Sequence, residues 1–202
     1  MAQMTANRGR KRPGGRSARI RDAVLTATIE VLTEDGLENL TIGAVAGRAG
    51  VHETSIYRRW GSLQSLMLDA SLQVADDAIS IPDTGALRSD LLMLMSHVIA
   101  LLHAPKGKAM LTLIEPWNED RQRAMKEFWK RRFENLQPMF DRAISRGEFP
   151  ADANTIVFVQ TLIAPLYFRL LVTAESLDDW PVAELVDRLL SAYLSSSLNR
   201  RA

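Results

Sequence analysis

Four side chains between positions 55 and 59 could contact the phosphate backbone of a nucleic acid. They are Ser55, Tyr57, Arg58 and Arg59. An element that enters the major groove of DNA places its flanking groups against two walls of phosphates, and hydroxyl-bearing or cationic side chains suit those positions. The three residues just before this set start the same segment and are the part that would reach base edges: His52, Glu53 and Thr54.

Two of these residues also have simpler explanations. Glu53 could accept a hydrogen bond from a cytosine amino group. It could equally oppose the helix macrodipole at a solvated N-terminus. His52 could serve only as a helix cap, and Trp60 is expected to anchor the end of the segment against a neighbouring helix.

The segment that carries these residues has the pattern of a helix-turn-helix. Two helices that cross closely need a small residue in the first, a turn residue that tolerates positive φ, and an apolar anchor in the second. Ala46, Gly50 and Ile56 meet those demands in order. An ordinary helical hairpin could show the same spacing, and the arginines favour the DNA-binding interpretation.

The preceding residues supply the bulk that this segment lacks. Apolar residues recur at intervals of three and four from Ile20 to Leu32, which predicts a helix from Ser17 to near Asp35 with one buried face. Thr41 is the expected N-cap of the first short helix, about residues 42–49.

Positive charge is concentrated at the N-terminal end. The net charge is +1 overall, but residues 1–60 sum to +4 and the remainder to −3. Such an asymmetry is typical of a chain that meets a polyanion at one end. Residues 1–16, rich in arginine, glycine and proline, are expected to form a disordered basic arm. The arm could enter an A·T-rich minor groove or contribute only general attraction.

The rest of the chain also has a helical pattern. Helices are expected over residues 62–79, 87–103, 108–114, 118–145, 154–173 and 182–198, with a kink at Pro165. The fold class is therefore all-α, with about nine helices and no convincing strand. The predicted domains are the arm (1–16), a helix-turn-helix domain (17–62), a connecting helix (63–80) and a larger helical domain (81–202).

The larger domain carries the candidates for ligand binding and dimerisation. An apolar cavity lined by flexible and aromatic side chains would suit an irregular ligand, although each residue could instead be core. These candidates are Met93, Met110, Phe128, Trp129, Phe133, Phe158 and Leu162. Apolar stripes on the last two helices could pair with the same helices of a second copy, or could face their own core. These stripes contain Val159, Ile163, Leu166, Leu170, Val186, Leu189, Leu190 and Tyr193.

Several functional classes find no support. The chain has no cysteine, which excludes disulfides and thiolate metal sites and fits a reducing cytoplasm. It has no G-x-S-x-G, H-E-x-x-H or phosphate-binding glycine motif, so we expect no enzyme. His97 and His103 lack a carboxylate spaced to complete a metal site, and no cofactor is expected. No apolar run reaches the roughly 18 residues that span a bilayer, which predicts no membrane segment.

Residues 41–66, "TIGAVAGRAGVHETSIYRRWGSLQSL", resemble the DNA-binding domain of the tetracycline-repressor (TetR) family. The shared pattern is a threonine-hydrophobic start, an A-x3-G-V turn, a tyrosine near the end of the recognition helix, an aromatic soon after, and a leucine on the next helix. The resemblance is close over residues 17–70 and loose beyond. It implies an N-terminal three-helix DNA-binding unit joined by a fourth helix to a larger helical ligand-binding and dimerisation domain.

The resemblance also implies roles for single residues. Thr41, Ser55, Tyr57 and Arg58 match family positions that commonly touch the DNA backbone. Leu63, however, stands where the family usually has a phosphate-gripping lysine, so part of that contact is expected from Arg59 or the basic arm. Thr54 occupies a position that is often glycine, alanine or proline, so an operator sequence cannot be transferred.

These observations lead to one hypothesis and one alternative. The hypothesis is a dimeric transcriptional repressor, bound to a palindromic double-stranded operator and released by a small apolar or amphipathic effector. The alternative is a helical module that binds small molecules or proteins and binds DNA only weakly.

Overall fold

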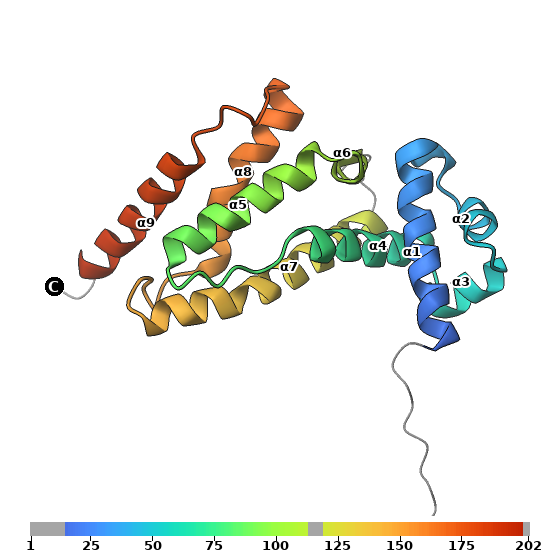
Figure 1. Ribbon diagram of the computed structural model, residues 1–202, viewed down its shortest axis with the longest axis horizontal. Helices are drawn as coiled ribbons and strands as arrows, with labels where there is room; N and C mark the ends of the chain where they lie inside the picture. Colours follow the sequence, from blue (N-terminus) through green and yellow to red (C-terminus); the bar gives the residue numbers. More distant parts are fainter. Residues whose placement is uncertain (1–14, 113–118, 200–202) are drawn as a thin grey trace, which may run out of the picture. The chain divides into compact units, whose positions relative to one another are not determined.

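The computed structural model describes residues 15–112 and 119–199. Within those ranges the chain forms nine α-helices and no strand, as predicted (Figure 1). The helices are α1 (Arg16–Glu34), α2 (Ile42–Ala49), α3 (Glu53–Trp60), α4 (Leu63–Ala78), α5 (Leu87–His103), α6 (Pro105–Leu111), α7 (Glu119–Ser145), α8 (Thr155–Phe168) and α9 (Val182–Asn199). A 3₁₀ turn, η1 (Leu37–Asn39), follows α1, and a π-helical turn, η3 (Arg169–Thr173), follows α8.

The observed helix bounds confirm most of the predicted ones. Helices α2 and α5 span the predicted residues, and α6 differs most. It begins at Pro105 because proline suits the first helical turn, where its missing N–H has no partner to lose. The end predicted for α6 falls on residues 113 and 114, outside the described ranges. Residues 1–14 of the predicted disordered arm also lie outside them, while Gly15 is the N-cap of α1 and Arg16 its first residue.

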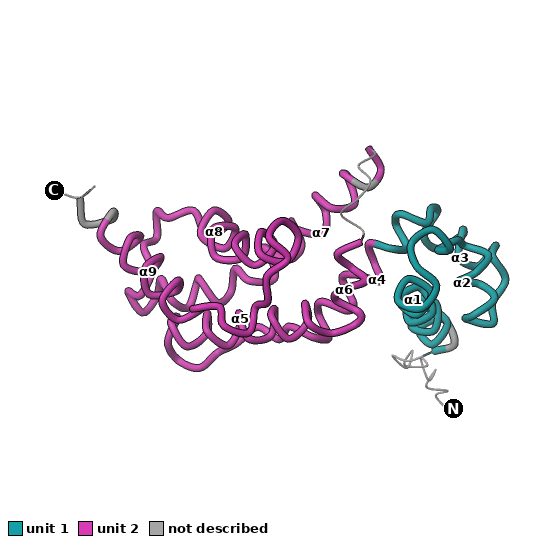
Figure 2. The backbone as a smooth tube through the Cα atoms, turned by 90° about the horizontal axis from the view of Figure 1, so that it is seen from above, with its two compact units in different colours: residues 1–67 teal, residues 68–202 magenta. Residues whose placement is uncertain are grey.

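The chain divides into two compact units (Figure 2). Unit 1 comprises residues 1–67 and unit 2 comprises residues 68–202. The division falls inside α4, which therefore contributes its first turn to unit 1 and its remainder to unit 2. This places the helix-turn-helix pattern wholly in unit 1 and the aromatic-rich helices in unit 2.

Four aromatic rings form the centre of the unit 2 core. The ring centroid of Phe158 lies 5.7 Å from that of Phe140, 5.2 Å from that of Phe149 and 5.0 Å from that of Tyr193. All three pairs meet edge to face, the arrangement that aromatic quadrupoles favour. Phe140 belongs to α7, Phe149 to the segment between α7 and α8, Phe158 to α8 and Tyr193 to α9. The cluster therefore packs four parts of the chain against one another.

Helices α5 and α6 meet at a sharp corner. Their axes differ by 83°, and Gly107 lies where the two backbones approach. A Cβ at this position would be 1.8 Å from the carbonyl oxygen of Leu101, far inside van der Waals contact. Only glycine therefore fits here.

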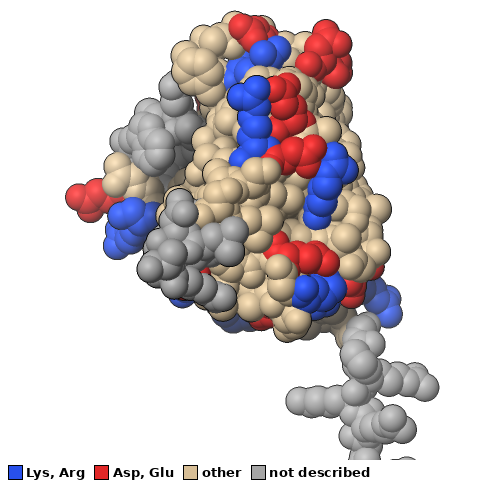
Figure 3. Space-filling view, turned by 90° about the vertical axis from the view of Figure 1, so that its left-hand side faces the viewer, with Lys and Arg blue, Asp and Glu red and all other residues tan. Residues whose placement is uncertain are grey.

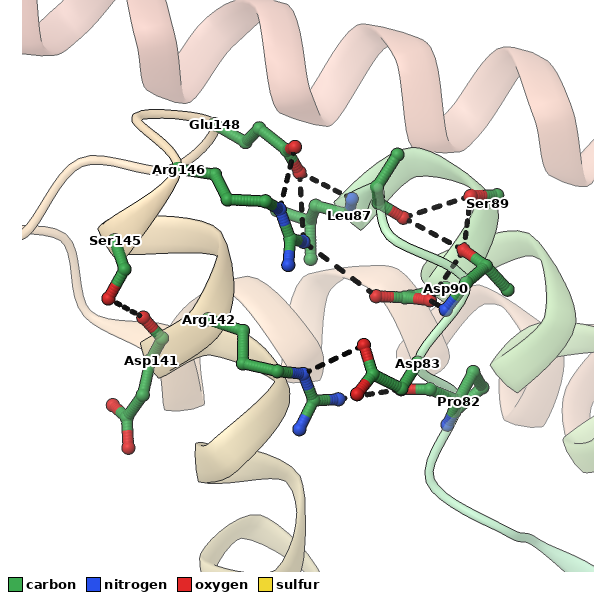
Figure 4. A network of polar contacts seen from close by, with 12 residues as sticks. Pro82, Asp83, Leu87, Ser89, Asp90, Asp141, Arg142, Ser145, Arg146 and Glu148 are labelled. Carbon is green, nitrogen blue, oxygen red and sulfur yellow. Dashed lines mark hydrogen bonds and ion pairs between the residues drawn. The ribbon is translucent and has the colours of Figure 1, made fainter.

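Arginines near the end of α7 hold the loop between α4 and α5 (Figure 4). The Arg142 guanidinium donates to the Pro82 carbonyl oxygen at 2.8 Å and pairs with the Asp83 carboxylate at 3.2 Å. One turn further on, Arg146 contacts both carboxylate oxygens of Glu148, at 2.8 and 3.1 Å. The α4–α5 loop is thus tied to α7 by side chains far away in the sequence.

Glu148 also stabilises the first turn of α5. Its carboxylate accepts a hydrogen bond from the backbone N–H of Leu87 at 2.5 Å, and a negative charge is favoured at a helix N-terminus. The hydrogen bond from Arg146, followed by that from Leu87, lowers the pKa of Glu148. Nearby, the buried carboxylate of Asp90 accepts from the backbone N–H and the hydroxyl of Thr84, at 2.6 and 2.7 Å.

The lowered pKa of Glu148 makes part of the stability acid-sensitive. A carboxyl whose folded pKa is below its unfolded value of about 4.3 contributes stability that is complete above that value and is lost as pH falls through the folded pKa. Glu148→Gln should therefore lower the free energy of unfolding near pH 7, and the deficit should shrink below about pH 4. Denaturant titrations across this pH range measure it. Glu134→Gln, which removes an exposed carboxylate 3.9 Å from Lys130, should lower the free energy of unfolding near pH 7 by less.

Helix α8 and η3 correct one expectation from the sequence. The helical stretch Thr155–Thr173 is long and apolar enough to cross a membrane, so the expectation that no run reaches that length is wrong. The bent pair α5–α6 would count as a second such segment. One or two such helices are weak evidence, because core helices of soluble proteins meet the same criteria. However, only 22% of the apolar window in α8 and η3 is buried within the chain.

Candidate nucleic-acid interface

The first helix of the motif, α2, is fixed at both ends by local interactions. Thr41 is its N-cap, and the Thr41 hydroxyl accepts a hydrogen bond from the backbone N–H of Ala44 at 3.1 Å, which confirms the predicted cap. Ile42, Val45 and Ala46 are buried, so α2 packs this face against its own unit. The exposed Thr41 lies at the edge of the motif, where its proposed contact with DNA remains a prediction.

The turn between α2 and α3 depends on Gly50. Its φ of 65° and ψ of 36° lie in the left-handed region, which glycine adopts without strain. The N–H of Gly50 donates to the Gly47 carbonyl at 3.3 Å, and that of Val51 donates to the Ala46 carbonyl at 3.0 Å. These two bonds form a Schellman motif, which satisfies the last carbonyls of α2 and redirects the chain into α3.

Helix α3 buries one residue, leaves Ser55 and Trp60 half-buried and exposes the others. Ile56 has no exposed area and anchors the helix in unit 1. Glu53, Thr54 and Arg58 are exposed, and 52% of Tyr57 is exposed. The helix therefore has a broad outward face made of residues that suit a groove of DNA.

The two arginines of α3 have different surroundings. Arg58 is exposed and has no hydrogen bond or ion pair with any part of the chain that the structure describes. Arg59 donates to the carbonyl oxygen and the hydroxyl of Ser17, both at 3.2 Å, and lies 5.5 Å from the ring centroid of Trp60. Arg58 is thus available to a phosphate, whereas Arg59 already holds α3 against the start of α1.

Ion pairs between α2 and the end of α1 stabilise the helix-turn-helix motif. Arg48 of α2 pairs with Glu34 at 2.5 Å and with Asp35 at 3.0 Å, at the end of α1. The hydrogen bond that Arg48 donates to the Glu34 carboxylate raises the pKa of Arg48. The carboxylate of Glu53 lies 3.3 Å from where a Cβ of Gly43 would be, near the N-terminus of α2. This position agrees with the dipole explanation for Glu53, although base contact remains a prediction. His52 is the N-cap residue of α3, without a side-chain cap bond.

Acidic and basic side chains alternate on part of unit 2. Figure 3 shows them next to one another among uncharged residues, without a large patch of one sign on the face drawn. Unit 2 contains several ion pairs, for example Arg88 with Asp187 at 2.6 Å and Arg146 with Glu148 at 2.8 Å. Such a surface offers a polyanion little net attraction.

The structure does not bring the seven predicted ligand residues together. Trp129 and Phe133 line an open groove of about 820 Å³ on α7 and α8, and Phe128 meets Trp129 edge to face at 5.3 Å. Phe158 and Leu162 have no exposed area and lie in the core. Met110 is half-buried on α6, and 43% of Met93 is exposed on α5, away from the groove-lining residues. Ligand contact by these residues remains a prediction.

The eight residues predicted for dimerisation differ in how deeply the single chain buries them. Val159, Leu166 and Val186 are buried in the core of their own chain, so they are not available to a second copy. The other five pack partly against the same core: Ile163, Leu170, Leu189, Leu190 and Tyr193. Contact between these five residues and a second copy remains a prediction.

One buried charge was not singled out from the sequence. Arg132 of α7 is 5% exposed and donates to the Asp76 carboxylate of α4 at 2.7 Å. Burial lowers the pKa of Arg132, and burial also raises the pKa of the neighbouring Tyr167 to about 12. The helical periodicity of the sequence could have indicated this burial, because Arg132 shares a helical face with the buried Leu136 and Met139.

The chain matches two family models. Residues 24–70 match the model described as "Bacterial regulatory proteins, tetR family". Residues 81–189 match the model described as "Tetracyclin repressor-like, C-terminal domain". The two matches correspond to the helix-turn-helix region and to most of unit 2.

Individual relatives agree with these matches. The chain is 33% identical over 149 residues to the HTH-type transcriptional regulator AqdR of Rhodococcus erythropolis, covering 73% of this chain and 72% of that protein. It is 29% identical over 175 residues to the DNA-binding transcriptional repressor TetR of Mycobacteroides abscessus, covering 83% and 90%. The crystal structure of the TetR family transcription regulator SCO0332 superposes with a TM-score of 0.73 and 30% identity, covering 86% of this chain and 97% of that one. The exposed recognition helix, the glycine turn and these matches together establish that the chain belongs to the TetR family of helix-turn-helix transcriptional regulators.

Proposed function

We propose that this regulator is a dimeric repressor that binds a palindromic operator through α3 and leaves it when a small amphipathic effector binds unit 2. The observation that carries the proposal is the outward face of α3. This helix buries only Ile56 and leaves Tyr57 and Arg58 exposed, with Arg58 unpaired within the described residues. A recognition helix has this arrangement because its side chains must be free to meet bases and phosphates.

The dimer is supported by the apolar surface that α8 leaves exposed. A twofold assembly would present two recognition helices to successive major grooves, which is why family operators of this kind are expected to be palindromic. The exposed side chains on this surface include Ile156, Phe168 and Val172. A single chain would leave them in water. A regulator that binds chromosomal DNA would act in the cytoplasm.

The interior of unit 2 supports an effector with a polar group rather than a purely apolar one. The buried Arg132 lies beside Tyr167, and the Tyr167 ring is 6.0 Å from that of Trp129. Aromatic walls next to a cation suit a ligand with an apolar body and an anionic or hydrogen-bonding end. Asp76, the partner of Arg132, belongs to α4, so a ligand that drew Arg132 away would act directly on that helix.

A gel shift on the DNA that flanks this gene tests the proposal. We expect a specific complex at moderate salt that unlabelled specific DNA displaces and unrelated DNA does not. Candidate effectors identified by thermal shift of the free protein should then dissociate the complex. If no specific complex forms although the protein is folded, the repressor proposal fails and a helical binding module with weak DNA affinity becomes the better explanation.

A further inference from the structure

Glu53 is the single acidic residue of the helix-turn-helix motif. Between Glu38 and Asp69 the sequence has no other aspartate or glutamate, whereas the same stretch has three arginines. An anion on a surface that meets phosphates opposes binding to every DNA sequence. A carboxylate at the start of the recognition helix therefore weakens binding to DNA in general, unless a base compensates its charge.

In the free chain the Glu53 carboxylate lies near two helix N-termini. Glu53 is the first residue of α3, and its Oε1 atom is 3.3 Å from where a Cβ of Gly43 would be, in the first turn of α2. The backbone N–H groups of Ile42 and Gly43 have no acceptor among the described residues, as is usual where a helix begins. The positive ends of both helix dipoles therefore favour a negative charge at this place.

No bond holds the carboxylate in this position. Glu53 is exposed, and its side chain has no hydrogen bond or ion pair within residues 15–112 and 119–199. Attraction to a helix end at an exposed site is weak and is screened by salt. The side chain can therefore turn toward a base without breaking an interaction of its own.

A carboxylate distinguishes base edges by the donors that they offer. In the major groove cytosine presents its N4 amino group, whereas guanine presents two acceptors and adenine presents an acceptor beside its amino group. A carboxylate accepts from the cytosine amino group and is repelled by the purine acceptors. The N-terminal residues of a recognition helix are the ones that contact base edges, and Glu53 has that position in α3.

We propose that Glu53 reads a cytosine in each half-site of the operator and, as an uncompensated anion, weakens binding to all other DNA. This inference rests on the proposed function, because it requires α3 to enter the major groove. It adds the base that one residue recognises and a source of discrimination against non-specific DNA. On a sequence without the cytosine, the carboxylate faces phosphates and base acceptors, and that repulsion lowers the affinity.

Glu53→Gln tests the electrostatic part of the proposal. The operator is first selected from random duplexes with the unmodified protein, and a scrambled duplex of the same length and base composition serves as non-specific DNA. Because the variant lacks the anion, it should bind the scrambled duplex more tightly than the unmodified protein does. The ratio of operator affinity to scrambled affinity should fall by about tenfold or more, as expected when a base contact is lost.

Replacing each base pair of the operator in turn tests the base contact. The unmodified protein should lose affinity when one particular C·G pair in each half-site is changed. Glu53→Gln should prefer A·T at that position, because a glutamine amide pairs with N6 and N7 of adenine. Glu53→Asp keeps the charge and shortens the side chain, so it should lose the cytosine preference while its binding to scrambled DNA stays weak.

Glu38→Gln is the matched control. Glu38 is exposed on η1 in the same unit, and its replacement changes the net charge equally, so both affinities should stay nearly unchanged. If the unmodified protein forms no specific complex, the proposed function fails and this inference fails with it. If a complex forms but Glu53→Gln, folded by circular dichroism, keeps every base preference or binds scrambled DNA no more tightly than Glu38→Gln, only this inference is overturned.

Discussion

Arg58→Ala is expected to weaken operator binding by about tenfold or more. Arg58 is exposed on α3 and has no internal partner in the described residues, so its charge is available to DNA. Each neutralised phosphate contributes about 0.9 to the slope of log affinity against log salt. A dimer loses two such contacts, and the slope should fall by about 2. Fluorescence anisotropy titrations at several salt concentrations measure both quantities.

Arg59→Ala is the matched control for this experiment. The Arg59 guanidinium is engaged with Ser17 and lies over Trp60, so its loss should lower the stability of unit 1 by about 1 kcal/mol. The salt slope should change less than in Arg58→Ala. Equal slope changes in two folded variants would show that both arginines contact phosphates, contrary to the division of roles inferred from their surroundings.

Phe158→Ala should be the most destabilising single change in unit 2. The side chain is fully buried and contacts three other aromatic rings, so removing it leaves a cavity that α7 and α9 cannot close. Such a truncation usually lowers the free energy of unfolding by about 3–5 kcal/mol. Chemical denaturation at a fixed protein concentration measures this loss, since a dimer would couple stability to concentration.

Phe133→Ala provides the comparison for Phe158→Ala. Phe133 is half-buried at the groove, and its ring stacks on that of Trp129 with 5.8 Å between the centroids. Its truncation should therefore lower the free energy of unfolding clearly less than Phe158→Ala does. A small loss for Phe158→Ala, accompanied by loss of effector response, would instead indicate that Phe158 lines a ligand cavity as the sequence suggested.

Local patterns predicted the helix-turn-helix well because its determinants are close in sequence. Thr41, Ala46, Gly50 and Ile56 act within one or two turns of one another, and cap, crossing, turn and anchor each require a particular kind of residue. The bounds of α2 followed directly. Local patterns could not tell that Arg58 is available to DNA whereas Arg59 is engaged within the chain, because the partner of Arg59, Ser17, is 42 residues away in the sequence.

The orientation of α8 could not be predicted for a different physical reason. A helix that is apolar on both sides has no dominant polar face, so periodicity cannot say which side meets the core. Val159 and Leu166 lie inward, while Val157 and Phe168 lie outward, although all four are apolar. Helix α9 has a clearer stripe, and one residue of it, Val186, is buried in the core of its own chain.

The contact at Gly107 limits how unit 2 can move. The backbones of α5 and α6 are in direct contact at Gly107, without a side chain between them that could change its rotamer. We therefore expect α5 and α6 to move together as one rigid body. A hinge that reorients α4 relative to α5 is therefore expected in residues 79–86, which Arg142 ties to α7 by donating to the Pro82 carbonyl oxygen.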